Sequence, residues 1–577
     1  MNSTPVSPLL AQAEPYSARP WLTIYREPVR DIVPEYADML SLFRAAVREA
    51  PSRPAIKYFD ATLSYEQVDD LSDRLATWLL GNGVAAGERI AVILQNVPHF
   101  VIAQVAAWKI GATPIPINPM NRERELTALF KDGSPVAVIA HQENAGLVES
   151  SLAAADLAGA AMLLVDSRQF QTRNDARVLP ESEASTQGSS FAQAITQPRL
   201  DAASAVTPKG ADIAFLVYTS GTTGTPKGAM ITHSNAAFNA QVYRDWMGLE
   251  AGGGILGLAP LFHVTGLIGH IAAAFLCSAP LVLSYRFDPA VMLESIREHE
   301  PHFVIGAITA FVAMMNAPGF DQRSFASIKR VYSGGAPIPP SVVEEFERKC
   351  GRYIHNGYGL TETTSPSHCV PFGRHAPVDP VSGALSIGVP VFNTDVMIIG
   401  EDGEPAPIGE HGEIVTKGPQ VVPGYWNKPQ ETADSITDGW LKTGDIGFMD
   451  EAGWFYLVDR KKDMINASGY KVWPREVEDV LYSHPAIREA AVIGIPDEYR
   501  GETVKAVVSL KPDASVETDD LIAFCKERMA SYKYPRLIDI IPDLPKTVTG
   551  KILRRELRDK ERQLPRPAPL KPSAFQP

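Results

Sequence analysis

The sequence predicts an α/β protein with a smaller α+β domain at its C-terminal end. Over the first several hundred residues, short apolar runs suited to buried strands alternate with longer runs suited to helices. From about residue 383 Gly and Pro become frequent, and after residue 460 a compact α+β pattern begins. Because a chain of 577 residues is too long for one hydrophobic core, several structural units are expected.

The N-terminal part starts with a clear helix signal. Ser64-Tyr-Glu-Gln67 is a capping box, which predicts a helix ending near residue 81. Strands over 89–94 and 113–117 enclose a helix over 98–110, which makes one β-α-β unit. The segment 169–208 is polar with weak periodicity, so we expect a surface excursion there. Further buried strands are predicted over 135–140, 161–165, 213–217 and 302–306.

The second half divides into a β-rich and an α+β part. A subdomain resembling a barrel is predicted over about 383–458, from strands over 395–399 and 412–416 and a hairpin over 447–457. After it we expect helices over 474–481 and 518–530, the first with Pro in its first turn, and strands over 490–494 and 503–510. The predicted divisions are a flexible leader (1–35), an N-terminal domain (36–460), a mobile C-terminal domain (461–564) and a disordered tail (565–577).

The composition is that of a globular protein, with 45% hydrophobic and 21% charged residues. No apolar run reaches the roughly 20 residues that span a bilayer, and the N-terminus lacks the pattern of a signal peptide. Four widely spaced cysteines without a CxxC pair predict neither a zinc site nor disulfides, so the cytoplasm is the expected location. The formal charge of −13 argues against a nucleic-acid partner.

The most informative segment is the run over 218–228, Tyr-Thr-Ser-Gly-Thr-Thr-Gly-Thr-Pro-Lys-Gly, which directly follows a predicted core strand. Glycines let backbone N–H groups approach a polyphosphate, hydroxyls donate hydrogen bonds, and Lys227 supplies a positive charge. The usual nucleotide P-loop would end in Gly-Lys-Ser/Thr. Here Pro226 precedes the lysine, so the loop is expected to stay extended and not to run into a helix.

Three further clusters fit the same chemistry. The run over 332–337, Tyr-Ser-Gly-Gly-Ala-Pro, offers small residues against which a flat ring could lie. In the run over 356–363, Tyr358 can stack on a purine and Glu362 can hold Mg²⁺. Asp445 follows a glycine turn, where its carboxylate could accept hydrogen bonds from ribose hydroxyls. Each cluster alone could be an ordinary turn, but together they favour a nucleotide site.

With these motifs in this order, the chain resembles the adenylate-forming superfamily from about residue 40 to 557. This superfamily contains acyl- and aryl-CoA synthetases, firefly-type luciferases and the adenylation domains of peptide synthetases. The resemblance implies a large N-terminal domain, made of two doubly wound α/β subdomains and a distorted β-barrel. It also implies a small mobile C-terminal domain, with a hinge over 459–463 and Lys462 at the pivot.

The resemblance also implies nucleotide contacts, residue by residue. Thr361 matches the α-phosphate contact and Glu362 the Mg²⁺ ligand. Asp445 and Arg460 match the ribose partners. The residues matching those that wrap the β- and γ-phosphates are Thr219, Ser220, Gly221, Thr222, Thr223, Gly224 and Lys227. Those matching the adenine site are Gly335, Ala336, Pro337, Asn356, Gly357, Tyr358 and Gly359.

The C-terminal domain should serve two half-reactions. Lys551, which ends the run Pro-Lys-Thr-Val-Thr-Gly-Lys over 545–551, matches the lysine that bridges the carboxylate and the α-phosphate while acyl-AMP forms from acid and ATP. In the second step coenzyme A attacks, and Gly469 matches a position beside the pantetheine tunnel, where a side chain would crowd the channel.

The acid itself is less well defined. His263 stands where amino-acid-activating relatives carry Asp, so an amino acid is disfavoured; the resemblance places it beside the carboxylate, although a purely structural histidine stays open. The matching acid pocket carries no cation, which disfavours a dicarboxylic acid. We favour a medium- or long-chain fatty acid, followed by an aryl acid. The predicted pocket residues are Ala237, Phe238, Gln241, Gly306, Ala307, Thr309 and Gly334.

Two other classes of function stay open. A luciferase-like oxygenase would use the same adenylation site, and a carrier-loading enzyme would need a partner in trans, because no Gly-Gly-x-Ser carrier site follows. The expected small molecules are ATP, Mg²⁺, coenzyme A and a carboxylic acid. Peripheral membrane contact and a homodimer are compatible with the sequence.

Overall fold

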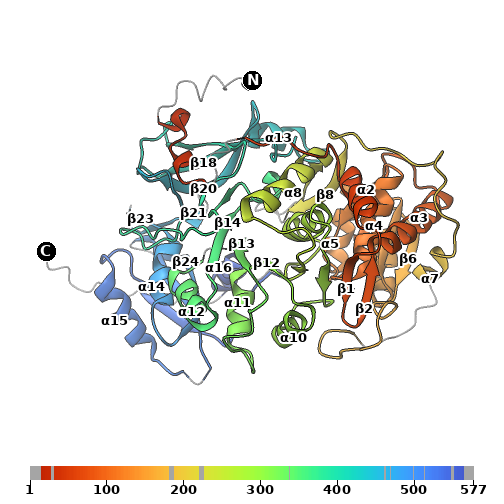
Figure 1. Ribbon diagram of the computed structural model, residues 1–577. Coiled ribbons are helices and arrows are strands. Elements are labelled where there is room, and N and C mark those ends of the chain that lie inside the picture. The colour runs from red at the N-terminus through yellow and green to blue at the C-terminus, as the bar shows by residue number, and fades with distance from the viewer. Residues whose placement is uncertain are drawn as a thin grey trace.

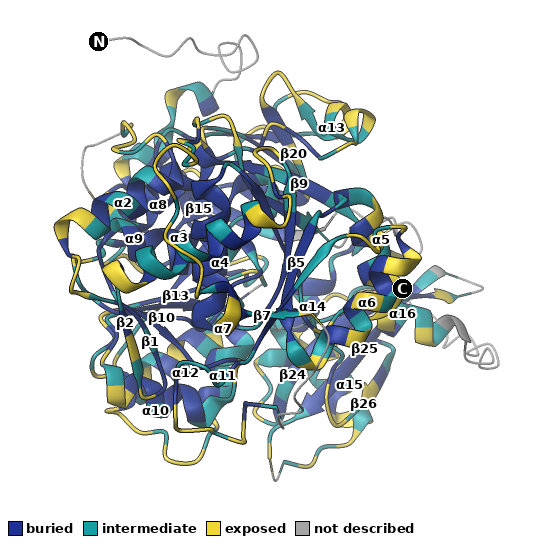
Figure 2. Cartoon of the chain, turned by 90° about the vertical axis from the view of Figure 1, so that its right-hand side faces the viewer, coloured by how far each residue is buried: buried dark blue, intermediate teal, exposed yellow. Residues whose placement is uncertain are grey.

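The computed structural model describes residues 15–26, 31–180, 188–219, 226–336, 338–460, 463–467, 470–497, 500–512, 514–547 and 551–563. Within these ranges it has the predicted α/β architecture, with two sheets flanked by helices, a β-rich subdomain and a small C-terminal domain (Figure 1). Buried residues fill the sheets and the inner helix faces, whereas exposed residues lie on outer surfaces such as those of α10 (Pro289–His299) and α13 (Pro429–Ser435) (Figure 2).

The first sheet is parallel and has five strands in the order β4-β3-β5-β6-β7. The predicted β-α-β unit is present, and every residue of its helix α4 is buried, as expected for a helix that is apolar all round. The predicted capping box of α3 is also present, with the Ser64 hydroxyl accepting from the Gln67 amide. The elements are β3 (Arg89–Ile93), β4 (Thr113–Pro116), β5 (Ala137–His141), β6 (Ala161–Val165), β7 (Ser189–Ser190), α3 (Tyr65–Gly81), α4 (Pro98–Lys109), α5 (Glu123–Gly133), α6 (Ala145–Ala154) and α7 (Phe191–Ala194).

The second sheet has nine strands in the order β16-β15-β14-β13-β12-β10-β11-β1-β2. The central strands run parallel, so the carboxyl ends of β12, β13 and β14 meet at one edge. The strands are β1 (Pro54–Tyr58), β2 (Ala61–Ser64), β10 (Ile255–Leu256), β11 (Leu281–Leu283), β12 (Phe303–Gly306), β13 (Arg330–Gly334), β14 (Ile354–Tyr358), β15 (His368–Cys369) and β16 (Val389–Pro390). The helices are α2 (Met39–Glu49), α8 (His233–Met247), α9 (Ala273–Leu276), α10, α11 (Ile308–Met315) and α12 (Pro340–Cys350).

A separate hairpin carries the Thr/Gly-rich segment. Strands β8 (Ile213–Thr219) and β9 (Lys227–Thr232) pair antiparallel, with Thr219 opposite Lys227. The lysine therefore begins a strand, and the chain does not run from this loop directly into a helix, as Pro226 predicted.

The remaining strands form two more sheets of five. The β-rich subdomain contains the predicted hairpin, with β20 antiparallel to β21. The C-terminal domain packs below it in Figure 1, where α14 and α15 are drawn in blue. The elements are β17 (Asp395–Ile399), β18 (Gly412–Lys417), β19 (Ile436–Thr437), β20 (Trp440–Met449), β21 (Phe455–Arg460), then β22 (Ile465–Ala467), β23 (Tyr470–Val472), α14 (Pro474–Tyr482), β24 (Ile487–Asp497), β25 (Gly501–Leu510), α15 (Thr518–Arg528), β26 (Leu537–Ile540) and α16 (Arg554–Gln563).

Within the predicted flexible leader (1–35), residues 15–26 are packed against the rest of the chain. Trp21 is completely buried against the β-rich subdomain, with its ring 5.7 Å from that of Phe455. The Tyr25 hydroxyl donates to the Pro390 carbonyl at 2.7 Å. The red segment in Figure 1 accordingly lies beside β18 and β20. Composition alone misses this, because the aromatic residues are buried only by partners hundreds of positions away.

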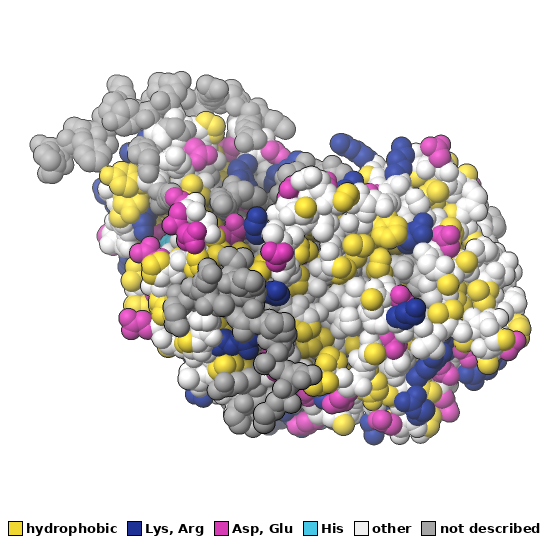
Figure 3. All heavy atoms as spheres, turned by 90° about the horizontal axis from the view of Figure 1, so that it is seen from above, with side chains coloured by type: hydrophobic (Ala, Val, Ile, Leu, Met, Phe, Trp, Pro, Cys, Tyr) yellow, Lys and Arg dark blue, Asp and Glu magenta, His cyan; other side chains and the backbone are white. Residues whose placement is uncertain are grey.

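All four cysteines are buried and unpaired, as their spacing predicts. Among the residues that the structure describes, no helix combines the length and apolar character needed to cross a membrane. On the face shown in Figure 3, Lys and Arg side chains are interspersed with Asp, Glu and apolar side chains.

Buried histidines make the fold sensitive to acid. Burial lowers the pKa of His368 to about 3 and that of His99 to about 4. Below about pH 6.5 the unfolded chain binds protons at these imidazoles and the native protein does not. The stability present at neutral pH is therefore lost as the pH falls towards the pKa values of these histidines in the folded protein.

For His368 alone, the free energy of unfolding should fall by about 1.4 kcal/mol per pH unit in this window. Urea unfolding between about pH 7.5 and pH 5 measures the slope. His368→Gln should reduce the slope by about 1.4 kcal/mol per pH unit, whereas His375→Gln, which changes a side chain that is 65% exposed, should leave the slope unchanged. Equal slopes for the wild type and His368→Gln would contradict this prediction.

Candidate active site

The predicted adenine residues gather at the carboxyl ends of β13 and β14. Gly334 pairs with Gly357 across these strands, and a Cβ on Gly334 would lie 2.6 Å from the Gly357 carbonyl oxygen. Gly335 follows with φ +81 and open space around it, a conformation that favours glycine. The Asn356 side chain donates to the Ser386 carbonyl at 3.0 Å. The strands thus present a flat backbone surface where a base could lie.

Tyr358 and Asp445 join this edge to the β-rich subdomain. Both side chains are buried, and the Tyr358 hydroxyl donates to Oδ2 of Asp445 at 2.7 Å. Asp445 on β20 pairs through its backbone with Arg460 on β21. The structure therefore brings together the three residues that were predicted to contact adenine and ribose.

A carboxylate, a phenol and an ammonium group form a second cluster nearby. Glu362 lies in a short 3-10 helix over Thr361–Thr363, and its Oε1 accepts a hydrogen bond from the Tyr425 hydroxyl at 2.8 Å. The Lys227 ammonium lies 5.2 Å from the centre of the Tyr425 ring, within cation–π range. Three distant chain segments thus place Lys227 and Glu362 against the same tyrosine, one at its ring and the other at its hydroxyl.

Sequence reasoning missed Tyr425. This residue forms a backbone bridge with Ala229 of β9, and the neighbouring Trp426 amide donates to the Gly228 carbonyl at 2.8 Å. Its only sequence signal is an aromatic pair after Gly424, directly before the Pro429 helix start. Neither ring is charged, so a search for chemically reactive groups passes over them.

His263 of the N-terminal domain lies within electrostatic reach of Lys551 of the C-terminal domain. The pKa of His263 falls to about 4, first because the imidazole is enclosed by protein and second because of the nearby positive charge of Lys551. The loop at Lys551 is braced, since its amide donates to the Thr547 hydroxyl at 3.0 Å and its carbonyl accepts from the Thr547 amide at 2.7 Å. The C-terminal domain thus presents its lysine to the N-terminal domain.

The predicted acid-pocket residues divide into two groups. On α8, Phe238 is 1% exposed and belongs to the hydrophobic core. The Gln241 side chain instead accepts from the Glu35 amide at 3.0 Å, which ties α8 to the N-terminal segment. Ala237 also lies on α8; Gly306, Ala307, Thr309 and Gly334 lie at the ends of β12 and β13 and the start of α11.

Part of the prediction lies outside the described residues. This applies to Pro337, Lys462 and Gly469, and to the loop positions Ser220, Gly221, Thr222, Thr223 and Gly224. The two ends of that loop are placed, by Thr219 and Lys227, so both its exit and its return lie on the β8–β9 hairpin.

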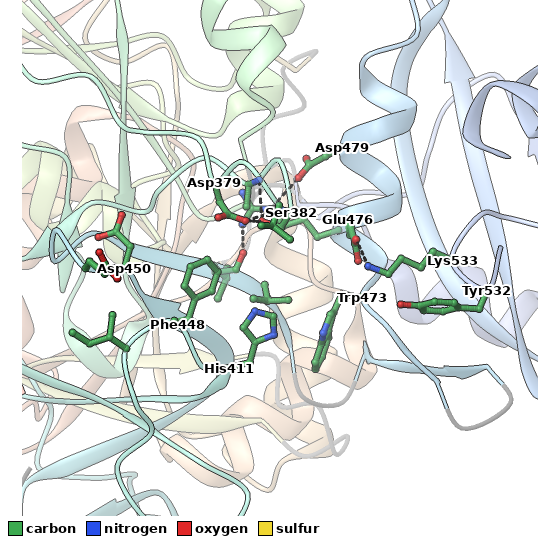
Figure 4. A pocket seen from close by; sticks show the side chains of 18 residues that line it. Asp379, Ser382, His411, Phe448, Asp450, Trp473, Glu476, Asp479, Tyr532 and Lys533 are labelled. Carbon is green, nitrogen blue, oxygen red and sulfur yellow. Dashed lines mark hydrogen bonds and ion pairs between the residues drawn. The ribbon is translucent and has the colours of Figure 1, made fainter. Parts of the chain in front are cut away.

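A cavity of about 560 Å³ separates the β-rich subdomain from the C-terminal domain (Figure 4). His411 and Phe448 line one side, and Trp473, Tyr532 and Lys533 line the other. Beside it, an Arg475 guanidinium N–H donates to the Leu457 carbonyl at 2.8 Å. None of the predicted site residues that the structure describes lines this cavity.

Known proteins share this sequence and fold. Residues 43–426 match the family described as AMP-binding enzyme, and residues 476–551 match its C-terminal domain. A long-chain-fatty-acid–CoA ligase of Bacillus subtilis is 36% identical over 562 residues, covering 94% of this chain and 98% of the relative. A feruloyl-CoA synthase of Amycolatopsis is 33% identical, covering 89% and 96%. An anthranilate CoA ligase in complex with anthranoyl-AMP superposes with a TM-score of 0.82 at 27% identity, covering 92% and 98%.

Fold, cluster geometry and relatives define an adenylate-forming enzyme, and the resemblance read from the motifs is confirmed. The chain belongs to the AMP-binding enzyme family and is an acid–thiol ligase, an AMP-forming acyl-CoA synthetase.

Proposed function

We propose that this enzyme activates a medium- or long-chain fatty acid as its coenzyme A thioester, using ATP and Mg²⁺. The observation that supports the use of a nucleotide is the cluster of Glu362, Tyr425 and Lys227. In this cluster a carboxylate and a cation contact the same tyrosine, beside the loop suited to polyphosphate. The choice of acid is supported by the long-chain-fatty-acid–CoA ligases, at 31–36% identity over nearly the whole chain.

In the first half-reaction, a carboxylate oxygen of the acid attacks the α-phosphorus of ATP. The bond to the bridging oxygen of diphosphate breaks, and acyl-AMP and diphosphate result. Negative charge increases on the phosphate oxygens, so cations must be in place before the reaction. Lys227 faces the β- and γ-phosphates in this proposal, and Lys551 bridges the acid and the α-phosphate beside His263.

Glu362 fits a magnesium site. Mg²⁺ takes hard oxygen ligands and is often held by one or two carboxylates together with substrate phosphates. The hydrogen bond from Tyr425 occupies Oε1 and fixes the carboxylate orientation, as partners of ligand residues do. When bound, the metal would neutralise phosphate charge; Thr361 would contact the α-phosphate from the same short helix.

In the second half-reaction, the thiolate of coenzyme A attacks the acyl carbonyl carbon, and AMP leaves. We propose that the C-terminal domain turns at its hinge, with Lys462 as pivot, and brings Gly469 beside the pantetheine arm. The residues that line the cavity in Figure 4 come from both domains, so such a rotation would change the shape of this cavity.

An aryl acid is the second candidate, favoured by the similarity to the feruloyl-CoA synthase. A CoA-dependent AMP-release assay over acids from acetate to oleate, with benzoates and cinnamates included, separates the two. We expect the highest kcat/KM with a fatty acid; a maximum with an aryl acid would overturn this choice. We also propose a cytoplasmic location, in agreement with four unpaired, buried cysteines.

The hydrogen bond between Tyr358 and Asp445 offers a test of the ribose assignment. Tyr358→Phe keeps the ring but removes the hydrogen bond that orients the Asp445 carboxylate, which should accept the ribose hydroxyls. The KM for ATP should therefore rise about 3- to 10-fold with little change in kcat. Tyr332→Phe is the matched control, because the described residues give its buried hydroxyl no hydrogen-bond partner. An equal effect of the two changes would remove the assignment.

A further inference from the structure

The small domain begins directly after the proposed hinge, and its lysine lies near the far end of its sequence. Asp463 immediately follows the pivot position, and Lys551 lies three positions before Arg554, the first residue of α16. If the domain turns as one body, the geometry between these two points must be fixed within the domain. The contacts around α14 and α16 provide this connection.

Arg554, the first residue of α16, lies between two carboxylates. Its Nε donates to Oε1 of Glu478 at 3.0 Å and its Nη2 to Oε2 at 2.5 Å, a two-pronged contact. Its Nη1 lies 3.6 Å from Oδ2 of Asp463. Arg558, one turn further along α16, donates to Oδ1 of Asp463 at 2.5 Å. One helix end is thus tied to both α14 and Asp463, the residue that follows the pivot position.

The side chains of this group are largely shielded from water. The exposed fractions of the Glu478, Asp463 and Arg554 side chains are 9%, 10% and 16%. Glu478 also accepts from the Val492 amide at 2.7 Å, which anchors the group to strand β24. Buried, forked contacts of this kind hold a fixed geometry better than exposed ion pairs do.

Hydrogen bonds connect the residues between Arg554 and Lys551 to the segment that precedes the lysine. The Leu553 amide donates to the Pro545 carbonyl at 2.8 Å, and Lys551 exchanges two hydrogen bonds with Thr547. A displacement of the start of α16 would therefore displace Lys551. Arg475, one turn before Glu478 on α14, donates a hydrogen bond across the hinge to the Leu457 carbonyl of β21.

We propose that Arg554 is a positioning residue: its bridge between Asp463 and Glu478 fixes the lysine loop relative to the hinge, so that rotation of the domain delivers Lys551 to the acid and the α-phosphate. This role rests on the proposed function of Lys551. Arg554 itself touches no substrate in this scheme, and its effect on the reaction passes through the lysine.

The test compares Arg554→Gln with Arg555→Gln, the same change one residue later on the same helix. Arg555 is 68% exposed and pairs only at 3.6 Å with Asp559. In the full-length enzyme, Arg554→Gln should slow diphosphate release without CoA roughly 10²-fold, mainly in kcat, because a small misplacement of a reacting group has a large cost. Thioester formation from supplied acyl-AMP should change less than about threefold.

Amide hydrogen exchange gives a readout that does not depend on catalysis. Arg554→Gln should speed exchange at the Lys551 and Leu553 amides and leave exchange in the N-terminal domain unchanged. Arg554→Lys should restore part of the rate of diphosphate release and part of the protection from exchange, since it keeps the charge but not the two-pronged contact. If Arg554→Gln does not fold, Arg554→Lys carries the same comparison.

Unchanged exchange at Lys551, or equal loss of both half-reactions, would overturn the positioning role. If instead the exchange prediction holds while Lys551→Ala retains full acyl-AMP formation, the bridge stands and the assigned role of Lys551 fails. The two proposals are therefore separated by the same set of variants.

Discussion

Replacing Lys551 by alanine should lower the rate of acyl-AMP formation roughly 10²–10³-fold, which is the cost of losing one preorganised charge at a reacting centre. The side chain comes from the C-terminal domain and lies close enough to His263 for its charge to lower the pKa of that imidazole. Single-turnover diphosphate release without CoA measures the step directly.

Lys546→Ala is the control for this change. Lys546 lies in the same stretch of chain, but its ammonium pairs with Glu489 at 2.8 Å and Asp543 at 2.7 Å, within the C-terminal domain. Its removal should alter the rate by less than about threefold. A loss below about threefold for Lys551→Ala, in a folded protein, would remove the lysine from the mechanism.

Glu362→Gln should have a comparably large effect, at least about 10²-fold on acyl-AMP formation. The amide keeps the size of the side chain but loses the negative charge that would hold Mg²⁺, so more metal should be needed for half-maximal rate. A titration of the rate against Mg²⁺ concentration checks both expectations.

Tyr425→Phe distinguishes the carboxylate from its support. This change removes only the hydroxyl that donates to Glu362, so the metal requirement should increase by about 10-fold or less, as for other residues that orient a ligand. If the metal dependence of Glu362→Gln matched that of the wild type, Glu362 would not be the metal ligand.

The sequence predicted those features of the structure that depend on residues close together in the chain. The capping box at Ser64 and the proline at Pro474 mark helix starts through contacts within one turn, and both helices are found. The Thr/Gly-rich loop could be placed because it follows a strand whose apolar character is visible in the chain. The adenine residues came from the family resemblance, and the structure places them where the parallel strands β13 and β14 end, at Gly334 and Gly357.

Other features depend on contacts that no local pattern encodes. The segment around Trp21 contains two prolines and shows no helix or strand periodicity, yet it is ordered by burial against Phe455. Tyr425 acquires its role only because a β bridge brings it to Ala229. The acid pocket depends on how α8 packs. Gln241 on this helix accepts a hydrogen bond from the Glu35 amide, and the sequence of the helix does not indicate this partner.

The most direct measurement of the central claim is exchange of labelled diphosphate into ATP, with the purified enzyme, Mg²⁺ and a series of carboxylic acids in the absence of CoA. The account predicts acid-dependent exchange that is strongest with a medium- or long-chain fatty acid and is lost in Lys551→Ala. If no acid in the series supports exchange, a mixed anhydride of acid and AMP is not formed, and the account is contradicted.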